Sequence, residues 1–163
     1  MKKLVSIIAV VALVAIVATL LVACVPTDPA KAEANLKEAG YTVIAYDKDD
    51  GLGLAGYTLP DGATNVVSGT KEADDDSASI IAETVTIFYF ESSDKAKAYF
   101  EKVYGDFDKQ QDEAKADLKE SYDAGELDKD EYDAMLEIIN NSQAKRFGKI
   151  VYSGTKAGIK AAS

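Results

Sequence analysis

The side chains available for chemistry in this chain are carboxylates, lysines, tyrosines, serines and threonines. The sequence contains no histidine and no tryptophan, and its one cysteine is Cys24. Without histidine, a Ser-His-Asp or Cys-His nucleophilic centre, a histidine zinc site and a histidine haem ligand are excluded. A single cysteine also excludes a disulfide within the chain. Although there are 28 acidic residues, no pair of them stands out by its spacing. We therefore expect no metal site, no cofactor and no enzymatic activity.

One short motif with the chemistry of an anion site occurs twice. Each copy reads Ser-Gly-Thr-Lys at the end of an expected strand, and the residues are Ser68, Gly69, Thr70 and Lys71, then Ser153, Gly154, Thr155 and Lys156. Glycine lets the backbone approach a ligand, threonine and backbone N–H groups donate hydrogen bonds, and lysine adds charge. The alternative is structural, with glycine taking the turn after the strand and threonine capping the next element.

The elements that must position these residues begin with an apolar N-terminal segment. Lys2 and Lys3 precede residues 4–23, which carry no charge, and residues 21–24 read Leu-Val-Ala-Cys. A basic start, an apolar core and small residues before a cleavage point are typical of an export signal. The final four residues resemble the lipobox of bacterial lipoproteins. That resemblance implies that residues 1–23 are a signal peptide and that Cys24 carries a lipid (diacylglycerol and an acyl chain such as palmitate) as the new N-terminus. The alternatives are an uncleaved membrane-spanning helix and a secretory signal cut elsewhere.

This interpretation predicts a protein anchored by lipid to the extracytoplasmic face of the cell membrane. Residues 24–28 would be the lipidated cysteine and a short tether. Without residues 1–23 the chain has 16 basic and 28 acidic residues, a formal charge of −12. This sign is opposite to that needed for binding nucleic acid, so we expect no nucleic-acid partner. We also expect anionic headgroups to repel the domain, which would then stay near the membrane only through its anchor.

The remaining residues, 29–163, predict a single α+β domain: a small, mostly antiparallel sheet with helices packed on one face. Asp28 and Pro29 predict the start of a helix over residues 30–39. Strands are expected over residues 41–46, 64–70, 79–91 and 146–152. Residues 79–91 carry apolar side chains on both faces, which favours a central position in the sheet. Ser93 or Asp94 is expected to cap the helix that follows, and Thr155 is expected to cap a final short helix.

An acidic helical hairpin is expected as an insertion over about residues 106–145, which hold 13 acidic and 5 basic residues. Gly125 separates its two helices, and Asp128 with Glu131 predicts a capping box for the second. Residues 118–132 resemble the helical hairpin of bacterial short C-terminal (SHOCT-like) domains, which implies a role in protein–protein contact. Two functional alternatives are an arm that binds a basic partner and one that loosely holds divalent cations. The structural alternative is a solvated insertion.

The whole chain after Cys24 resembles small lipoproteins of Gram-positive bacteria that have no assigned activity. The resemblance rests on the helix that ends at Gly40-Tyr41, on the strand with Phe88-Tyr89-Phe90, and on residues 150–156. Our first hypothesis is a non-enzymatic binding or interaction module whose partner is an envelope protein or another cell-surface molecule. The alternative is a carboxylate-dependent envelope hydrolase acting on glycans, which requires two carboxyl groups about 5–10 Å apart in a cleft. A solute-binding lipoprotein is less favoured, because the chain is short for a two-lobed clamp.

Overall fold

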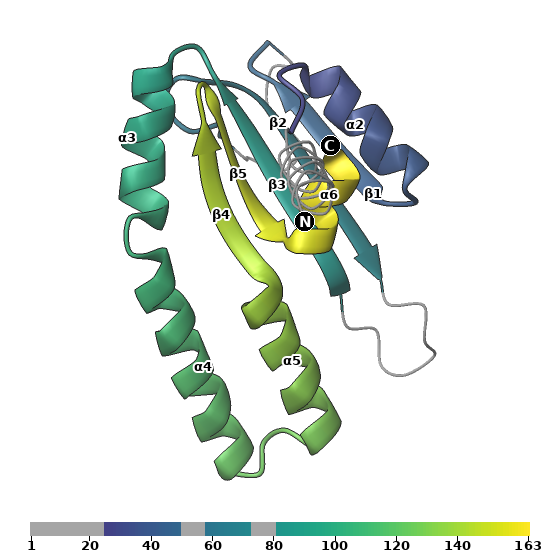
Figure 1. Ribbon diagram of the computed structural model, residues 1–163, viewed down its shortest axis with the longest axis vertical. Coiled ribbons are helices and arrows are strands. Elements are labelled where there is room, and N and C mark those ends of the chain that lie inside the picture. Colours follow the sequence, from purple (N-terminus) through teal and green to yellow (C-terminus); the bar gives the residue numbers. More distant parts are fainter. Residues whose placement is uncertain (1–24, 50–57, 73–80) are drawn as a thin grey trace, which may run out of the picture.

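The computed structural model describes residues 25–49, 58–72 and 81–163 (Figure 1). In chain order its elements are α2 (Pro29–Glu38), β1 (Thr42–Asp47), β2 (Ala63–Glu72), β3 (Ile81–Phe90), α3 (Ser93–Tyr104), α4 (Phe107–Asp123), α5 (Lys129–Asn141), β4 (Ser142–Phe147), β5 (Ile150–Thr155) and α6 (Lys156–Ala162).

The strands form one five-stranded antiparallel sheet in the order β1-β2-β3-β5-β4. β3 lies at its centre, in agreement with the apolar residues on both of its faces. The longest pairing joins β2 and β3, from Ala63 opposite Phe90 to Glu72 opposite Ile81. The α+β class predicted from the sequence is confirmed.

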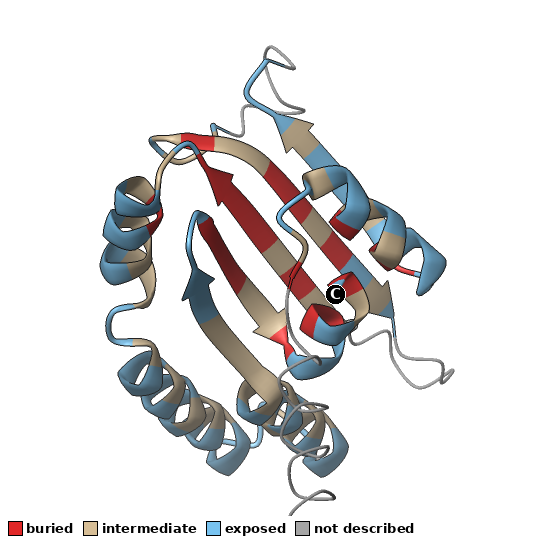
Figure 2. Cartoon of the chain, turned by 45° about the horizontal axis from the view of Figure 1, so that its top comes forward, coloured by how far each residue is buried: buried red, intermediate tan, exposed pale blue. Residues whose placement is uncertain are grey.

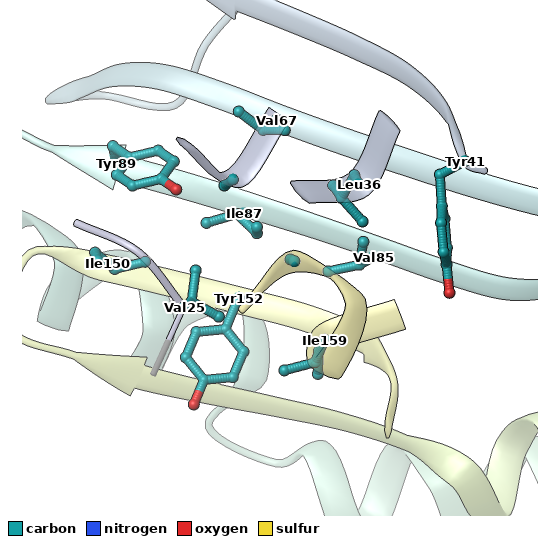
Figure 3. Close-up of a cluster of buried hydrophobic side chains, with 12 residues drawn as sticks. Val25, Leu36, Tyr41, Val67, Val85, Ile87, Tyr89, Ile150, Tyr152 and Ile159 are labelled. Carbon is teal, nitrogen blue, oxygen red and sulfur yellow. The ribbon is translucent and has the colours of Figure 1, made fainter. Parts of the chain in front are cut away.

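Helices cover both faces of this sheet, and the buried residues run along its central strands (Figure 2). α2 and α6 pack on one face, whereas α3 packs on the other, where Tyr99 contacts Phe88 and Phe90 with ring centroids 5.1 and 5.3 Å apart. The position of α3 therefore departs from the expectation of helices on one face. The reason is the alternation along β3, which directs apolar side chains to both faces. The cluster under α2 and α6 (Figure 3) contains Val25, Ala32, Leu36, Tyr41, Val67, Val85, Ile87, Tyr89, Ile150, Tyr152, Ile159 and Ala162.

The capping signals of α2, α5 and α6 act as the sequence indicates, whereas α3 is capped by Ser92 and not by the expected Ser93 or Asp94. The side chain of Asp28 accepts a hydrogen bond from the backbone N–H of Ala30 at the start of α2. Asp128 and Glu131 form the predicted capping box of α5. Thr155 caps α6 by accepting from the backbone N–H of Gly158 at 3.1 Å. Each cap satisfies backbone donors that the first turn of a helix leaves without a partner.

The strand expected over residues 146–152 is wrong as a single element, since the structure divides it between β4 and β5. Gly148, with φ +56°, lies in the short turn between them. The chain reverses there, and Phe147 pairs with Ile150 across the hairpin. β4 begins at Ser142. The two helices α4 and α5 therefore span residues 107–141 of the expected insertion over about residues 106–145.

Candidate functional site

The segment after the predicted lipidation site is a packed part of the domain. Cys24 itself lies outside the described residues. Val25 is 5% exposed and belongs to the cluster that contains Ile150, Tyr152 and Ile159 (Figure 3). The carbonyl of Pro26 accepts a hydrogen bond from the hydroxyl of Tyr89 at 3.1 Å. The predicted tether of residues 24–28 is therefore held against the sheet from Val25 onward.

Tyr89 is the buried polar contact of this segment. Its burial, with the nearby carboxylate of Asp28, raises the pKa of its hydroxyl well above the ordinary value. Both effects disfavour the phenolate, because a charge would be desolvated and would face a second negative charge. Tyr89 therefore remains a neutral donor that holds the backbone at Pro26.

An open groove of about 600 Å³ lies beside Val25 at the edge strand β4. Its walls combine apolar side chains, among them Phe100 and Tyr152, with basic ones. Phe147, at the end of β4, lines the same groove and is 64% exposed. The basic residues that line the groove are Lys97, Lys145 and Arg146, and the acidic one is Glu101. An exposed aromatic residue among bases is thus close to the proposed anchor.

The two Ser-Gly-Thr-Lys copies come together on either side of β3. Ser68 and Ser153 both lie opposite Thr86, while Gly69 and Gly154 both lie opposite Val85. The two copies therefore occupy the same register on the two strands that neighbour β3, except that Lys156 already belongs to α6.

Packing and capping account for several members of these copies. A Cβ on Gly154 would lie 2.2 Å from the carbonyl oxygen of Thr84, and one on Gly69 would lie 3.2 Å from the side chain of Leu36. Thr155 donates to the carbonyl of Thr84 at 3.3 Å while it caps α6.

The remaining polar members have different surroundings. Ser68 lies 3.0 Å from the hydroxyl of Thr86, and Ser153 lies 2.9 Å from that of Tyr104. The Lys71 ammonium is 6.0 Å from the centre of the Tyr41 ring. Lys156 is exposed at the first position of α6, and Thr70 is exposed on β2. The anion site stays a prediction, and these contacts match the structural alternative.

The carboxylate of Glu83 accepts a hydrogen bond from the hydroxyl of the buried Tyr41. Burial and this acidic neighbour raise the pKa of Tyr41 above its ordinary value. Among the residues whose burial the structure describes, Thr155 is the one buried polar residue apart from tyrosines, and no carboxylate is buried. In the described part of the chain, no three acidic or cysteine side chains group as metal ligands would. The glycan hydrolase stays a prediction, and this part of the chain offers no buried pair of carboxylates for it.

The acidic hairpin, which we call the arm (α4 and α5), projects beyond the sheet (Figure 1). Gln111 ties its two helices at the base by donating to the carbonyls of Ile139 and Ser142 at 2.7 and 3.0 Å. Near its tip the rings of Tyr122 and Tyr132 stack with centroids 4.7 Å apart. Neither helix contains a buried residue. The apolar side chains along α4 and α5 are therefore only partly buried against each other, and Met135 remains 38% exposed.

Sequence reasoning missed two features of this site, the buried Val25 and the exposed Phe147. A lone valine before a proline is typical of a linker, and nothing in its neighbours indicates burial. Phe147 was expected within a strand, where aromatic residues are usually half-buried. The bases on both sides of Phe147, in an otherwise acidic chain, were the signal in the sequence that could have indicated an exposed position.

Comparisons with protein families, curated proteins and solved structures identify no relative of this chain. No family model matches the chain, and neither a curated protein nor a solved structure matches it significantly. Among the residues that the structure describes, no helix is both long and apolar enough to cross a membrane.

Proposed function

We propose that this protein is an extracytoplasmic lipoprotein. A lipid on Cys24 would hold it at the outer face of the cell membrane, where its domain serves as a non-enzymatic interaction module. The anchor is supported by the charged start, the apolar residues 4–23 and the small residues before Cys24. The packing of Val25 in the core supports a short connection between lipid and domain.

The observation that carries the interaction role is the arm. An amphipathic helix normally buries its apolar stripe against a core, and most of its stability comes from that packing. Here two helices of 17 and 13 residues project from the sheet without burying any residue. The partly exposed Tyr122 and Met135 lie among many carboxylates. A protein partner with an apolar groove flanked by basic residues would match this surface in shape and charge.

The anchor is tested by the intact mass of the protein from native membranes. We expect a chain that begins at Cys24 and carries lipid, and we expect a Cys24→Ala variant to lose the lipid and the membrane association. An unmodified full-length mass would contradict the anchor.

The arm is tested with a photo-crosslinking amino acid in place of Met135 in living cells. The control places the same group at Lys31, which is exposed on α2. We expect a discrete crosslinked protein from position 135 and none from position 31. Equal crosslinking from both positions, with the lipid present, would contradict the role of the arm and leave the anchor intact.

A further inference from the structure

The charge of this protein is distributed very unevenly along the chain. Glu137 is its last acidic residue, and the 26 residues after it contain five bases. These residues comprise the end of α5 and all of β4, β5 and α6. A domain with a strongly negative net charge therefore contains a segment whose charged side chains are all basic.

Three of these bases surround the turn between β4 and β5. Lys145, Arg146 and Lys149 are exposed, and within the described residues none of them forms an ion pair. The guanidinium of Arg146 donates to the carbonyl of Gly148 at 3.2 Å and thereby stays at the turn. Their charges are thus available to an anionic surface.

Phe147 lies between these bases and is the most exposed large apolar side chain of the described residues, at 64%. Its pairing with Ile150 places it on the sheet face that carries Val25, and Lys145, opposite Tyr152, shares that face. Arg146, opposite Val151, starts on the other face, and its guanidinium reaches the turn at Gly148. An exposed aromatic ring flanked by long basic side chains is the chemistry of a membrane interface, where the ring enters the headgroup layer and the bases contact phosphates.

The turn between β4 and β5 lies beside the tether that follows Cys24, and this position favours a lipid bilayer as the partner of the exposed bases and Phe147. Val25 and Phe147 line one groove, and Thr27 with Phe147 and Lys149 lines a second one. A peptide bond puts the Cα atoms of Val25 and Cys24 about 3.8 Å apart. Because Val25 is buried in the domain, a lipid on Cys24 would hold this surface at the bilayer and prevent the domain from moving freely on a linker.

We propose that Lys145, Arg146, Phe147 and Lys149 form a membrane-docking surface that binds anionic phospholipid headgroups. The proposal rests on the lipid anchor at Cys24 and adds an orientation to it. The net charge predicts repulsion from such a bilayer, but screening confines that effect to about 8–10 Å, so the local bases decide the contact. The turn and the tip of the arm lie at opposite ends of the molecule (Figure 1). Docking through the turn therefore directs the arm away from the membrane.

The test uses the lipidated protein in vesicles of phosphatidylcholine and phosphatidylglycerol in equal amounts. Lipidation consumes the one cysteine of the chain, so a second cysteine accepts a nitroxide label uniquely. Phe147→Cys reports on the docking surface, and Glu126→Cys, exposed at the tip of the arm, is the matched control. We expect label 147 to be shielded from a water-soluble nickel complex and accessible to oxygen, and label 126 to show the reverse.

A charge variant tests the basis of docking. Near an anionic surface each base changes partition about fivefold, so Lys145→Gln with Lys149→Gln should lower the ratio of docked to undocked domain about 25-fold. Equal exposure of labels 147 and 126 on a chain with confirmed lipid would overturn the docking surface and leave the anchor intact. If each chain took up two nitroxide labels, Cys24 would carry no lipid, and both the anchor and the docking surface would be refuted. Because all these side chains are exposed, circular dichroism should show unchanged folding.

Discussion

The same substitution in the two Ser-Gly-Thr-Lys copies should have very different effects on stability. Gly154 has φ +143°, and an added Cβ would lie 2.2 Å from the carbonyl oxygen of Thr84 and 2.7 Å from the Cα of Val85. Both neighbours are backbone atoms of the central strand, so neither can move without disturbing the sheet. Gly69 has no unusual φ, and its Cβ would meet side-chain atoms of Leu36 at 3.2 and 3.3 Å.

The magnitudes follow from these distances. For Gly154→Ala, backbone strain costs about 1–3 kcal/mol and overpacking adds about 1–3 kcal/mol. Their sum, about 2–6 kcal/mol, is a large part of the roughly 5–15 kcal/mol that stabilises a typical domain. For Gly69→Ala, the lower entropy of the unfolded chain gains about 0.4–1 kcal/mol. Leu36 can shift by a few tenths of an ångström at a comparable cost, so the net change should stay within about 1 kcal/mol.

The assay is urea unfolding of the purified protein followed by far-ultraviolet circular dichroism. We expect Gly154→Ala to lower the unfolding midpoint strongly or to prevent folding, and Gly69→Ala to leave it nearly unchanged. Equal losses in the two variants would refute the reasoning, because the tetrapeptides are identical and only their neighbours differ.

Three further effects are expected. Val25→Ala should lower the free energy of unfolding by about 1–3 kcal/mol in urea titrations, since it removes buried methyl groups; no change would mean that the tether is free. Burial raises the pKa values of Tyr41 and Tyr89 in the folded protein above the ordinary 10.0. The stability that the two neutral hydroxyls contribute is therefore fully present below pH 10 and is lost as the pH rises further. Urea titrations at rising pH should show this loss, and Tyr41→Phe with Tyr89→Phe should reduce it. Asp128→Ala should cost about 1 kcal/mol through the lost cap of α5, measured by thermal unfolding, with exposed Asp130→Ala as a milder control.

Much of the fold was predictable because its signals are local. Asp28, Asp128 and Thr155 each cap a helix with a side chain that reaches only two or three residues along the chain. The alternation along β3 identified the central strand, since its period of two residues assigns each side chain to a face. The division between β4 and β5 was missed, because a two-residue turn at Gly148 interrupts a run with continuous strand character.

The candidate site was less predictable, because its members come from distant parts of the chain. The repeated tetrapeptide was visible in the sequence, but its placement on both sides of β3 depends on strand order. Val25 is buried in a cluster to which β5 and α6, more than a hundred residues later, contribute. Phe147 is exposed because β4 is the edge strand and the described helices leave its ring uncovered.

The sequence by itself determined the α+β class, the helix caps, the central strand and the acidic hairpin, since short-range hydrogen bonding and side-chain periodicity encode them. The tertiary structure alone decided that α3 packs on the opposite face from α2 and α6, that the arm buries no residue, and that the basic turn lies beside Val25. These features depend on which surfaces meet when the helices pack on the sheet, and such contacts join residues far apart in the chain.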